Sequence, residues 1–168
     1  MKIQQGGPGL TAIVPAPFGA MGIRSDGVAL RQLLYLPAHY AEGAATPADA
    51  ISALAARQLL AYFDDPDQRF DLPLASVGSA FQQRVWQAVA AIPRGQVRTY
   101  GQVARQIGSA ARAVGQACGA NWFPLLVPCH RVTAAAGLGG FANDDNAAGF
   151  HLGVKRWLLA HEDVAGYT

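Results

Sequence analysis

The segment "PCHRV", residues 128–132, places Cys129 directly beside His130. A cysteine attacks as its thiolate, and an ordinary thiol pKa of about 8.5 leaves only a small fraction ionised at neutral pH. An imidazole can remove the thiol proton, and a carboxylate can orient that imidazole. Glu162, the only glutamate in the second half of the chain, is the candidate carboxylate. These residue types predict a nucleophilic site, but a buried structural Cys–His pair fits them equally well.

The adjacency of Cys129 and His130 restricts how the imidazole can reach the sulfur. Successive side chains of an extended segment point to opposite faces, so neighbours in such a segment do not touch. His130 can therefore act only if the backbone turns after Pro128, or if a water molecule bridges the sulfur and the imidazole. The sequence leaves both routes open.

The length and composition of the chain limit the kind of protein in which these residues can lie. With 168 residues, of which 51% are hydrophobic, the chain can form one domain or two small ones. Two cysteines, Cys118 and Cys129, are too few for a disulfide scaffold and are typical of a reducing compartment. We expect no metal and no other cofactor. The first residues show no signal pattern, and no apolar run approaches the length of about 20 residues that a membrane span needs. We expect a cytoplasmic protein, or a nuclear one if the source is eukaryotic.

The charge is distributed unevenly along the chain. The segment from Arg84 to Asn143 contains six arginines and neither Asp nor Glu. Guanidinium groups bind phosphate in a bidentate manner, so this segment is typical of a surface that faces nucleic acid. Chance in a chain with few charges is the alternative. The six residues are Arg84, Arg94, Arg98, Arg105, Arg112 and Arg131.

The first third of the chain predicts a small sheet covered by one helix. Runs rich in β-forming residues alternate with turns, and "SDG" at 25–27 is a good hairpin turn. A helical pattern then begins with Thr46 as N-cap and Pro47 in the first helical position. Turn residues over 66–78 predict a linker. The expected strands lie near 10–14, 20–24 and 28–36.

The remaining chain is mostly helical. "SAFQ" at 79–82 and "TYGQ" at 99–102 both match the capping box, which marks two helix starts. The first helix should end near Ile92 and the second at Gly108, after which Ser109 could cap a third. A short helix, a glycine-containing turn and a small-residue helix form a helix-turn-helix pattern. Structural helical hairpins share this pattern and are commoner.

Several motifs together resemble the O6-alkylguanine-DNA alkyltransferases, also called methylated-DNA–protein-cysteine methyltransferases. "PCHRV" is similar to their active-site motif, "FQQRVWQAVAAIPRGQVRTYGQVARQIG" to the segment before it, "AARAVGQACGAN" to their recognition helix and "VKRWLLAHE" to their closing helix. The resemblance covers residues 79–162 in order. It implies an RNase H-like N-terminal α/β domain over residues 1–75, with a three-stranded antiparallel sheet plus a helix. It also implies an all-α C-terminal domain with a helix-turn-helix over residues 76–168.

The resemblance also implies the reaction, which is single-turnover repair of O6-alkylguanine, and of O4-alkylthymine as a further possible substrate, in double-stranded DNA. In this reading Cys129 accepts the alkyl group, His130 is the base acting through water, and Glu162 orients His130. Asn121 resembles the hinge asparagine of the family, and Tyr100 resembles the tyrosine that bonds the purine ring nitrogen. The protein would act as a monomer and would have no membrane as a partner.

Further residues acquire roles from the same resemblance. Arg112 would fill the place of the extruded base, and the small residues Ala113 and Gly115 would let the helix approach the DNA backbone. The Val132 carbonyl would contact the guanine amino group, and Lys155 would help to hold the site. Phe141, Ala142 and Pro124 complete the expected substrate pocket.

The loop after the active-site motif departs from the family. Phe141 and Ala142 are kept, but the Gly-Gly pair that usually follows them in the family is missing, and the segment 139–157 is several residues longer. It adds two acids, Asp144 and Asp145, near a site that must accept DNA. We therefore expect this loop to swing away or to face solvent. Two other functions fit part of the pattern: a lesion-binding protein that flips the base without transfer, and a helix-turn-helix regulator. The former lacks the reactive cysteine, so Cys129 argues against it.

Overall fold

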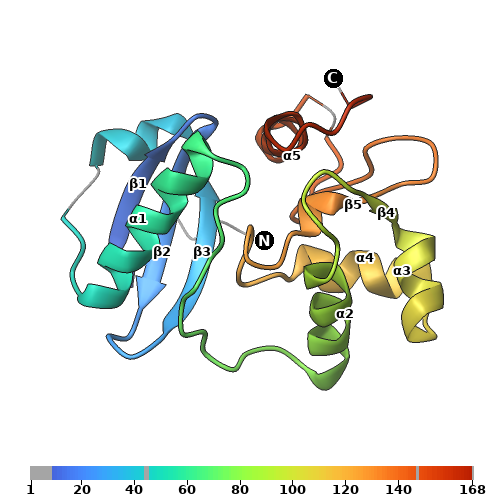
Figure 1. The fold of residues 1–168 in the computed structure, drawn as a ribbon, viewed down its shortest axis with the longest axis horizontal. Helices are drawn as coiled ribbons and strands as arrows, with labels where there is room; N and C mark the ends of the chain where they lie inside the picture. Colours follow the sequence, from blue (N-terminus) through green and yellow to red (C-terminus); the bar gives the residue numbers. More distant parts are fainter. Residues whose placement is uncertain (1–8, 44–45, 147, 168) are drawn as a thin grey trace. The chain divides into compact units, whose positions relative to one another are not determined.

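The computed structural model describes residues 9–43, 46–146 and 148–167. The described residues up to Val77 form one compact unit, and those from Gly78 onward form a second (Figure 1). Each unit contains its own buried apolar residues, and each is described separately below.

The first unit is built on a three-stranded antiparallel sheet in the order β1-β2-β3. The three expected strands are confirmed, with slightly displaced ends. At the expected turn, Asp26 Oδ1 accepts hydrogen bonds from the amides of Val28 and Ala29 at 2.9 and 2.8 Å, and Gly27 has a φ of 84°. The strands are β1 (Ala12–Ala16), β2 (Gly19–Ser25) and β3 (Leu30–Leu36).

One helix, α1 (Ala50–Asp64), packs on this sheet and buries Leu59 and Tyr62. The expected N-cap at Thr46 is wrong, because Asp49 caps the helix by accepting from Ser52 N at 2.8 Å. The preceding chain is tied to the start of β1, where Ala48 N donates to Thr11 O at 2.9 Å, so the helix cannot begin earlier. A 3-10 helix, η1 (Ala38–Gly43), follows β3.

The expected linker at 66–78 is irregular apart from one contact with the sheet edge. Leu30 N donates to Pro73 O at 2.7 Å, and Ala75 N donates to Leu30 O at 2.9 Å. This pairing joins residues 73–75 to the first unit.

The second unit consists of four helices, a 3-10 turn and two very short strands among the described residues. Both capping boxes are confirmed: Ser79 and Thr99 each accept from the backbone three residues on, and Gln82 and Gln102 bond back to them. The helices are α2 (Ala80–Ala90), α3 (Tyr100–Ile107), α4 (Ala111–Gly119) and α5 (Phe150–His161). The 3-10 turn is η2 (Cys129–Arg131).

The connection between α3 and α4 is short. Gly108 ends α3 in the left-handed conformation, with a φ of 69°, which glycine adopts without strain. Ser109 does not cap α4 as expected, because its amide donates to Ala104 O at 2.8 Å and belongs to the last turn of α3. Ala110 takes the N-cap position without a side-chain hydrogen bond.

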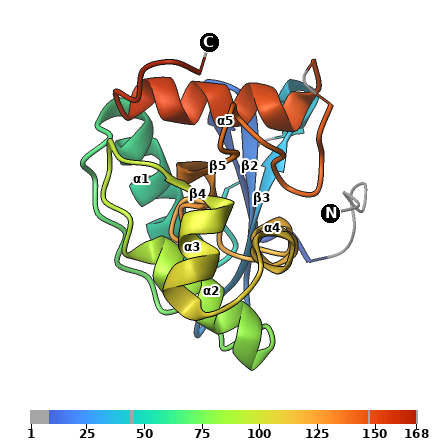
Figure 2. The same ribbon diagram turned by 90° about the vertical axis from the view of Figure 1, so that its right-hand side faces the viewer.

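A parallel pair of strands shows that the second unit is not all-α as expected. β4 (Arg98–Thr99) pairs with β5 (Val132–Thr133), with Arg98 opposite Val132. The pair lies between α5 and the cluster of α2, α3 and α4 (Figure 2). Because β4 leads directly into α3 and β5 follows η2, this pairing holds the start of α3 beside the turn that carries Cys129.

Candidate active site

Cys129 lies on a tight turn and is buried. The backbone bends after Pro128, whose ψ is 65°, and Cys129 begins the 3-10 turn. Cys129 N donates to Val127 O at 2.8 Å, and Arg131 N donates to Pro128 O at 2.9 Å. The extended geometry that would have pointed Cys129 and His130 to opposite faces is therefore absent at this position.

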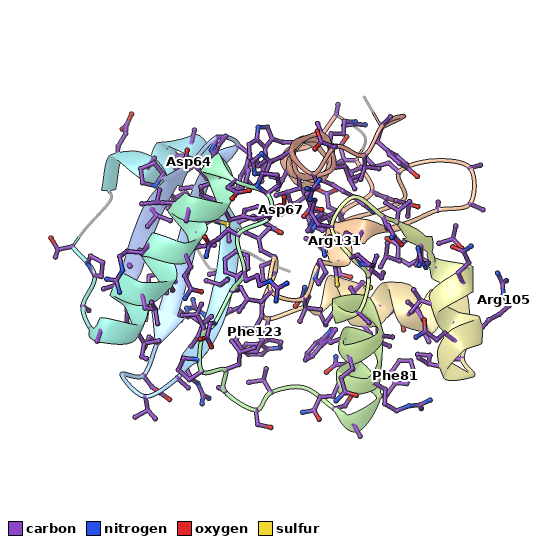
Figure 3. The ribbon with its side chains drawn as sticks, in the orientation of Figure 1. Asp64, Asp67, Phe81, Arg105, Phe123 and Arg131 are labelled. Carbon is purple, nitrogen blue, oxygen red and sulfur yellow. The ribbon has the colours of Figure 1, made fainter. Side chains whose placement is uncertain are left out.

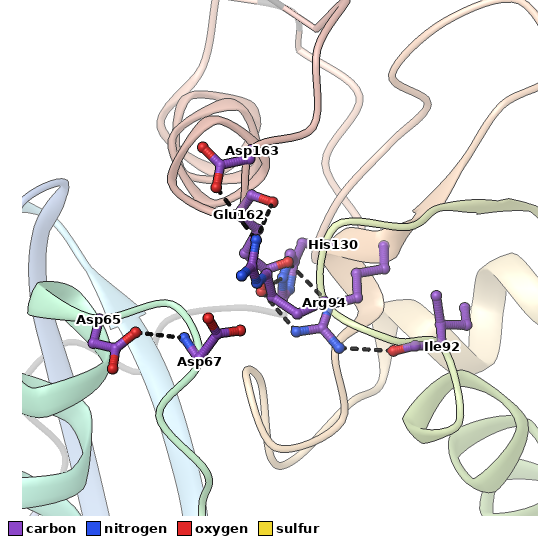
Figure 4. Close-up of polar contacts among 8 residues, drawn as sticks. Asp65, Asp67, Ile92, Arg94, His130, Glu162 and Asp163 are labelled. Carbon is purple, nitrogen blue, oxygen red and sulfur yellow. Dashed lines mark hydrogen bonds and ion pairs between the residues drawn. The ribbon is translucent and has the colours of Figure 1, made fainter.

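His130 and Glu162 form a fully buried pair. His130 Nε2 lies 2.8 Å from Glu162 Oε1, and neither side chain is exposed (Figure 4). Burial lowers the pKa of His130, and this outweighs the opposing effect of Glu162, so the imidazole is neutral at neutral pH. A neutral imidazole whose Nε2–H donates to the carboxylate carries its lone pair on Nδ1. That Nδ1 is buried and has no hydrogen-bond partner among the described residues, so it can accept a proton.

Arg131 completes the anchoring of Glu162. Its Nε donates to Glu162 Oε2 at 2.9 Å, its Nη2 donates to Oε1 at 2.8 Å, and its Nη1 donates to Ile92 O at 2.7 Å. Burial raises the pKa of Glu162, but the hydrogen bonds from His130 and Arg131 outweigh it and hold that pKa well below its ordinary value. Glu162 is therefore a carboxylate at neutral pH, and its charge is compensated.

This role corrects the expectation that Arg131 faces phosphate. Figure 3 shows Arg131 among the elements of the second unit, whereas Arg105 extends outward from α3. Sequence reasoning missed the pairing because the arginine run alone does not distinguish a buried guanidinium from an exposed one.

The thiol of Cys129 is held in its protonated form. A hydrogen bond to Cys118, burial and the charge of Cys118 raise the pKa of the Cys129 thiol well above its ordinary value. A hydrogen bond from Asn121 and the positive charge of Lys155 oppose this shift. Because the raising effects dominate, Cys129 needs a base to become a nucleophile at neutral pH.

Asn121 links the end of α4 to the approach to Cys129. Its backbone amide donates to Cys118 O at 3.2 Å, and its Nδ2 donates to Val127 O at 2.8 Å. Its Oδ1 accepts from Phe123 N at 2.9 Å. The expected hinge residue thus bonds both to the helix exit and to the segment before the acceptor turn. Pro124, also expected at the site, is buried within that connecting segment.

Lys155 is a fully buried cation surrounded by carbonyl groups. Its Nζ donates to the carbonyl oxygens of Val132, Leu138 and Gly140 at 2.8, 2.7 and 2.9 Å. Burial lowers the pKa of Lys155 to about 8, although the charges of Cys118 and Cys129 oppose the shift. Lys155 therefore ties β5 to the following loop.

A cavity of about 370 Å³ opens beside Cys129. Of the expected site residues, five line it: Tyr100, Gly115, Cys129, Phe141 and Ala142. Six more residues line it that the sequence did not identify: Cys118, Gly119, Gly140, Asn143, Asp144 and Asp145. The other expected residues lie outside the lining: Asn121, Pro124, His130, Val132, Lys155, Glu162, Arg112 and Ala113.

The hydroxyl of Tyr100 is already bonded inside this site. It donates to Gly140 O at 3.0 Å, and burial raises the pKa of the phenol far above its ordinary value. Gly115 faces the same ring, since a Cβ placed on it would lie 3.9 Å from Tyr100. The spacing of Gly115, Cys118 and Gly119 at i, i+3 and i+4 is the signal that could have identified this helical face as cavity wall.

The loop after Gly140 lines the cavity and does not swing away, but it faces solvent in part, because Asn143 and Asp145 are exposed. Phe141 and Asp144 exchange backbone hydrogen bonds of 2.8 Å in each direction. Asn143 Nδ2 donates to Gly119 O at 3.1 Å, and Asp144 Oδ2 lies 3.3 Å from His151 Nδ1. The two acids therefore lie at the cavity wall, and the loop is attached both to α4 and to α5.

Three of the expected DNA-contacting residues lie in the first half of α4. Arg112 is exposed in the first turn of the helix, and Ala113 and Gly115 are partly exposed. Within the described ranges, no group of three His, Cys, Asp or Glu side chains could hold a metal ion, and no helix is long and apolar enough to cross a membrane.

These features define a class of protein in which a buried cysteine, next in the chain to a neutral histidine that a carboxylate holds, faces a cavity beside a short two-helix motif. Residues 80–164 match the family model described as "6-O-methylguanine DNA methyltransferase, DNA binding domain". This chain therefore belongs to the methylated-DNA–protein-cysteine methyltransferase family, and it is a DNA-repair methyltransferase with a protein cysteine as acceptor.

Individual relatives agree with this assignment. The chain is 41% identical over 128 residues to the methylated-DNA–protein-cysteine methyltransferase of Mycobacterium tuberculosis, covering 74% of this chain and 78% of that protein. It is 37% identical over 159 residues to the Methanosarcina barkeri enzyme of the same name, covering 90% and 95%. The crystal structure of Mycobacterium tuberculosis OGT in complex with DNA superposes with a TM-score of 0.73 at 38% identity, covering 90% of this chain and 92% of that one. The regulatory protein ada of Salmonella typhimurium is 43% identical, but the chain spans only 30% of its length.

Proposed function

We propose that this protein repairs DNA by transferring the alkyl group of O6-alkylguanine, irreversibly and once per molecule, to Cys129. The observation that carries the proposal is the arrangement at the acceptor turn. Cys129 lines a cavity of about 370 Å³, and the adjacent His130 is fixed by Glu162 with its Nδ1 unpartnered among the described residues. O4-alkylthymine is a second substrate that such a cavity could accept.

The transfer begins with removal of the thiol proton. His130 Nδ1 takes the proton of Cys129 through a bridging water, and Glu162 stabilises the imidazolium that forms. The amide of Asn121 and the ammonium of Lys155 favour the resulting thiolate. The sulfur then attacks the alkyl carbon in line, the C–S bond forms, and the bond from that carbon to O6 breaks.

The leaving guanine takes the electron pair of the broken bond. The imidazolium of His130 gives back, through water, the proton that it took from the thiol, and this proton neutralises the negative charge of the guanine. The Tyr100 hydroxyl exchanges its bond to Gly140 O for a hydrogen bond to the purine ring. The Val132 carbonyl already accepts from Lys155, but a carbonyl oxygen has two lone pairs and can also accept from the guanine amino group. The product at Cys129 is a thioether, which has no ready hydrolytic route, so each molecule acts once.

The target base must leave the DNA stack to reach this cavity, at a cost of a few kcal/mol. We propose that α3, the turn at Gly108 and α4 act as a helix-turn-helix, with α4 against the DNA. Arg112 is exposed in the first turn of α4 and can fill the space left by the base. The small side chain of Ala113 and the absence of one at Gly115 permit close approach.

The proposed domain organisation follows from these assignments. Residues 1–75 form an RNase H-like domain, and residues 76–168 form the DNA-binding and alkyl-accepting domain. The protein acts as a monomer in the cytoplasm, or in the nucleus if its source is eukaryotic. Its two free thiols and its DNA substrate support this location.

The test uses duplex DNA with a single O6-methylguanine labelled in the methyl group. After incubation, the protein is digested and the label is mapped to peptides. The proposal expects the label on Cys129, none on Cys118, and no more than one methyl group per protein. Label that stays on the DNA would support a lesion-binding protein instead. Transfer that survives Cys129→Ala, or that exceeds one equivalent, would overturn the proposed acceptor or the single-turnover mechanism.

A further inference from the structure

The second cysteine of the chain lies in the same cavity as the first. Cys118 is the penultimate residue of α4 and, like Cys129, is a free and buried thiol that lines the cavity. The Cys118 side chain interacts with that of Cys129 and raises the pKa of the Cys129 thiol. The transfer reaction described above uses Cys129 alone and gives Cys118 no task.

The backbone around the two cysteines keeps them together. Asn121 N donates to the carbonyl oxygen of Cys118 at 3.2 Å, and Asn121 Nδ2 donates to Val127 O at 2.8 Å. The same Val127 oxygen accepts from Cys129 N at 2.8 Å. One asparagine therefore holds together the two chain segments that carry the cysteines, and both cysteines line one cavity.

The surroundings favour thiol–disulfide chemistry at this pair. The ammonium of Lys155 interacts with both cysteines, and its charge favours the thiolate of Cys129. A thiolate in contact with a second thiol is the arrangement from which an oxidised sulfur is resolved as a disulfide. The cavity is reachable by small solutes, because exposed residues, Asn143 and Asp145, form part of its wall.

We propose that Cys118 and Cys129 form an intramolecular disulfide when a small peroxide enters the cavity, and that this bond reversibly blocks the alkyl acceptor. One thiolate attacks the peroxide, its sulfur becomes a sulfenic acid, and hydroxide leaves and is protonated to water. The second thiol then attacks the sulfenic sulfur, and a second water leaves as the disulfide forms. Hydrogen peroxide takes up the two electrons that the two thiols lose. An external dithiol reverses the change by becoming a disulfide itself.

The disulfide has two consequences for the site. In the disulfide, the Cys129 sulfur cannot become a thiolate, so it cannot attack an alkyl carbon. The disulfide also protects Cys129 from further oxidation to sulfinic acid, a product that external dithiols do not reduce back to the thiol. The second consequence distinguishes a paired cysteine from an isolated one.

The experiment treats the full-length protein with a small excess of hydrogen peroxide and maps the thiols by mass spectrometry after blocking under denaturing conditions. We expect a mass lower by two hydrogen atoms and a cross-linked pair of peptides containing Cys118 and Cys129. This readout does not depend on alkyl transfer. The disulfide can therefore be refuted while the proposed function stands, and the reverse also holds. Sulfinic acid at Cys129 without the cross-linked pair, or disulfides only between molecules, would overturn the inference.

The matched variant is Cys118→Ser, with each protein compared with its own untreated activity. After peroxide, the parent protein should recover most of its transfer activity on addition of dithiothreitol. Cys118→Ser should recover at least several-fold less after the same prolonged exposure, because its Cys129 proceeds to sulfinic acid. Equal recovery in both proteins would contradict a protective role for the pair.

Discussion

Replacing Glu162 by glutamine removes one negative charge from the buried group that holds His130 and Arg131. In the carboxylate, both oxygens accept hydrogen bonds, from His130 or Arg131, at 2.8 or 2.9 Å. Glutamine keeps only one such oxygen, and its amide NH₂ group then faces another donor. Breaking a buried ion pair costs about 3–5 kcal/mol, because the remaining charge loses its counter-ion. Arg131 retains its bond to Ile92 O and is 13% exposed, so we expect the lower end, about 3 kcal/mol. For a chain of this length that corresponds to a fall in Tm of roughly 6–12 °C.

The effect on transfer has a separate cause. Without the carboxylate, the tautomer and orientation of His130 are no longer fixed, and the imidazolium loses its stabilising charge. Positioned acid–base catalysis contributes about 10²- to 10⁴-fold, so we expect the single-turnover rate of Glu162→Gln to fall by about 10²-fold or more. The assay measures label transfer from O6-methylguanine DNA at a temperature where both proteins are folded, and thermal unfolding is followed in parallel.

Arg131→Gln is the control that separates stability from chemistry. It also breaks the buried ion pair, but it leaves the 2.8 Å bond between His130 and Glu162 in place. We expect a similar loss of Tm and a much smaller loss of rate. A Glu162→Gln rate within about twofold of the parent protein, or equal rate losses in both variants, would refute the orienting role of the carboxylate.

Three further predictions concern other parts of the second unit. Burial lowers the pKa of His130 below 6.5, and hydrogen bonds outweigh burial to hold that of Glu162 below 4.5, so the unfolded state takes up protons first. The free energy of unfolding should therefore decrease as pH falls below 6.5 and again below 4.5, and Glu162→Gln should lack the lower step in acid titrations. Gly139 has a φ of 73° and its Cβ would lie 2.9 Å from a neighbouring ring, so Gly139→Ala should lower stability by about 1–3 kcal/mol in denaturant unfolding. Gly137→Ala, with nothing within 4 Å, should change it by less than about 0.5 kcal/mol, and equal effects would contradict this reading. Arg112→Ala should weaken binding to duplex DNA and reduce the salt dependence by about one ion, whereas Arg112→Lys should keep that dependence.

Local patterns sufficed for the parts of the fold that depend on neighbours in the chain. The hairpin turn at Asp26, both capping boxes and the end of α3 at Gly108 were predictable, because the groups that satisfy each backbone amide lie within four residues. Thr46 and Ser109 were wrong as caps for a complementary reason. In both cases a hydrogen bond from a distant or preceding element fixes where the helix begins.

The chemical identity of the acceptor site was also determined by the sequence. The order of Cys129, His130 and Glu162 within a run of matching motifs defined the family and the reaction, since each residue type has a restricted set of roles beside a reactive thiol. What only the tertiary structure decided is which groups surround these three residues. Arg131 turns inward onto Glu162, and Cys118 lines the same cavity as Cys129. Both arrangements bring together residues that are far apart in the chain, as do the pairing of β4 with β5 and the Asn121 bonds, and no local pattern of charge or hydrophobicity encodes them.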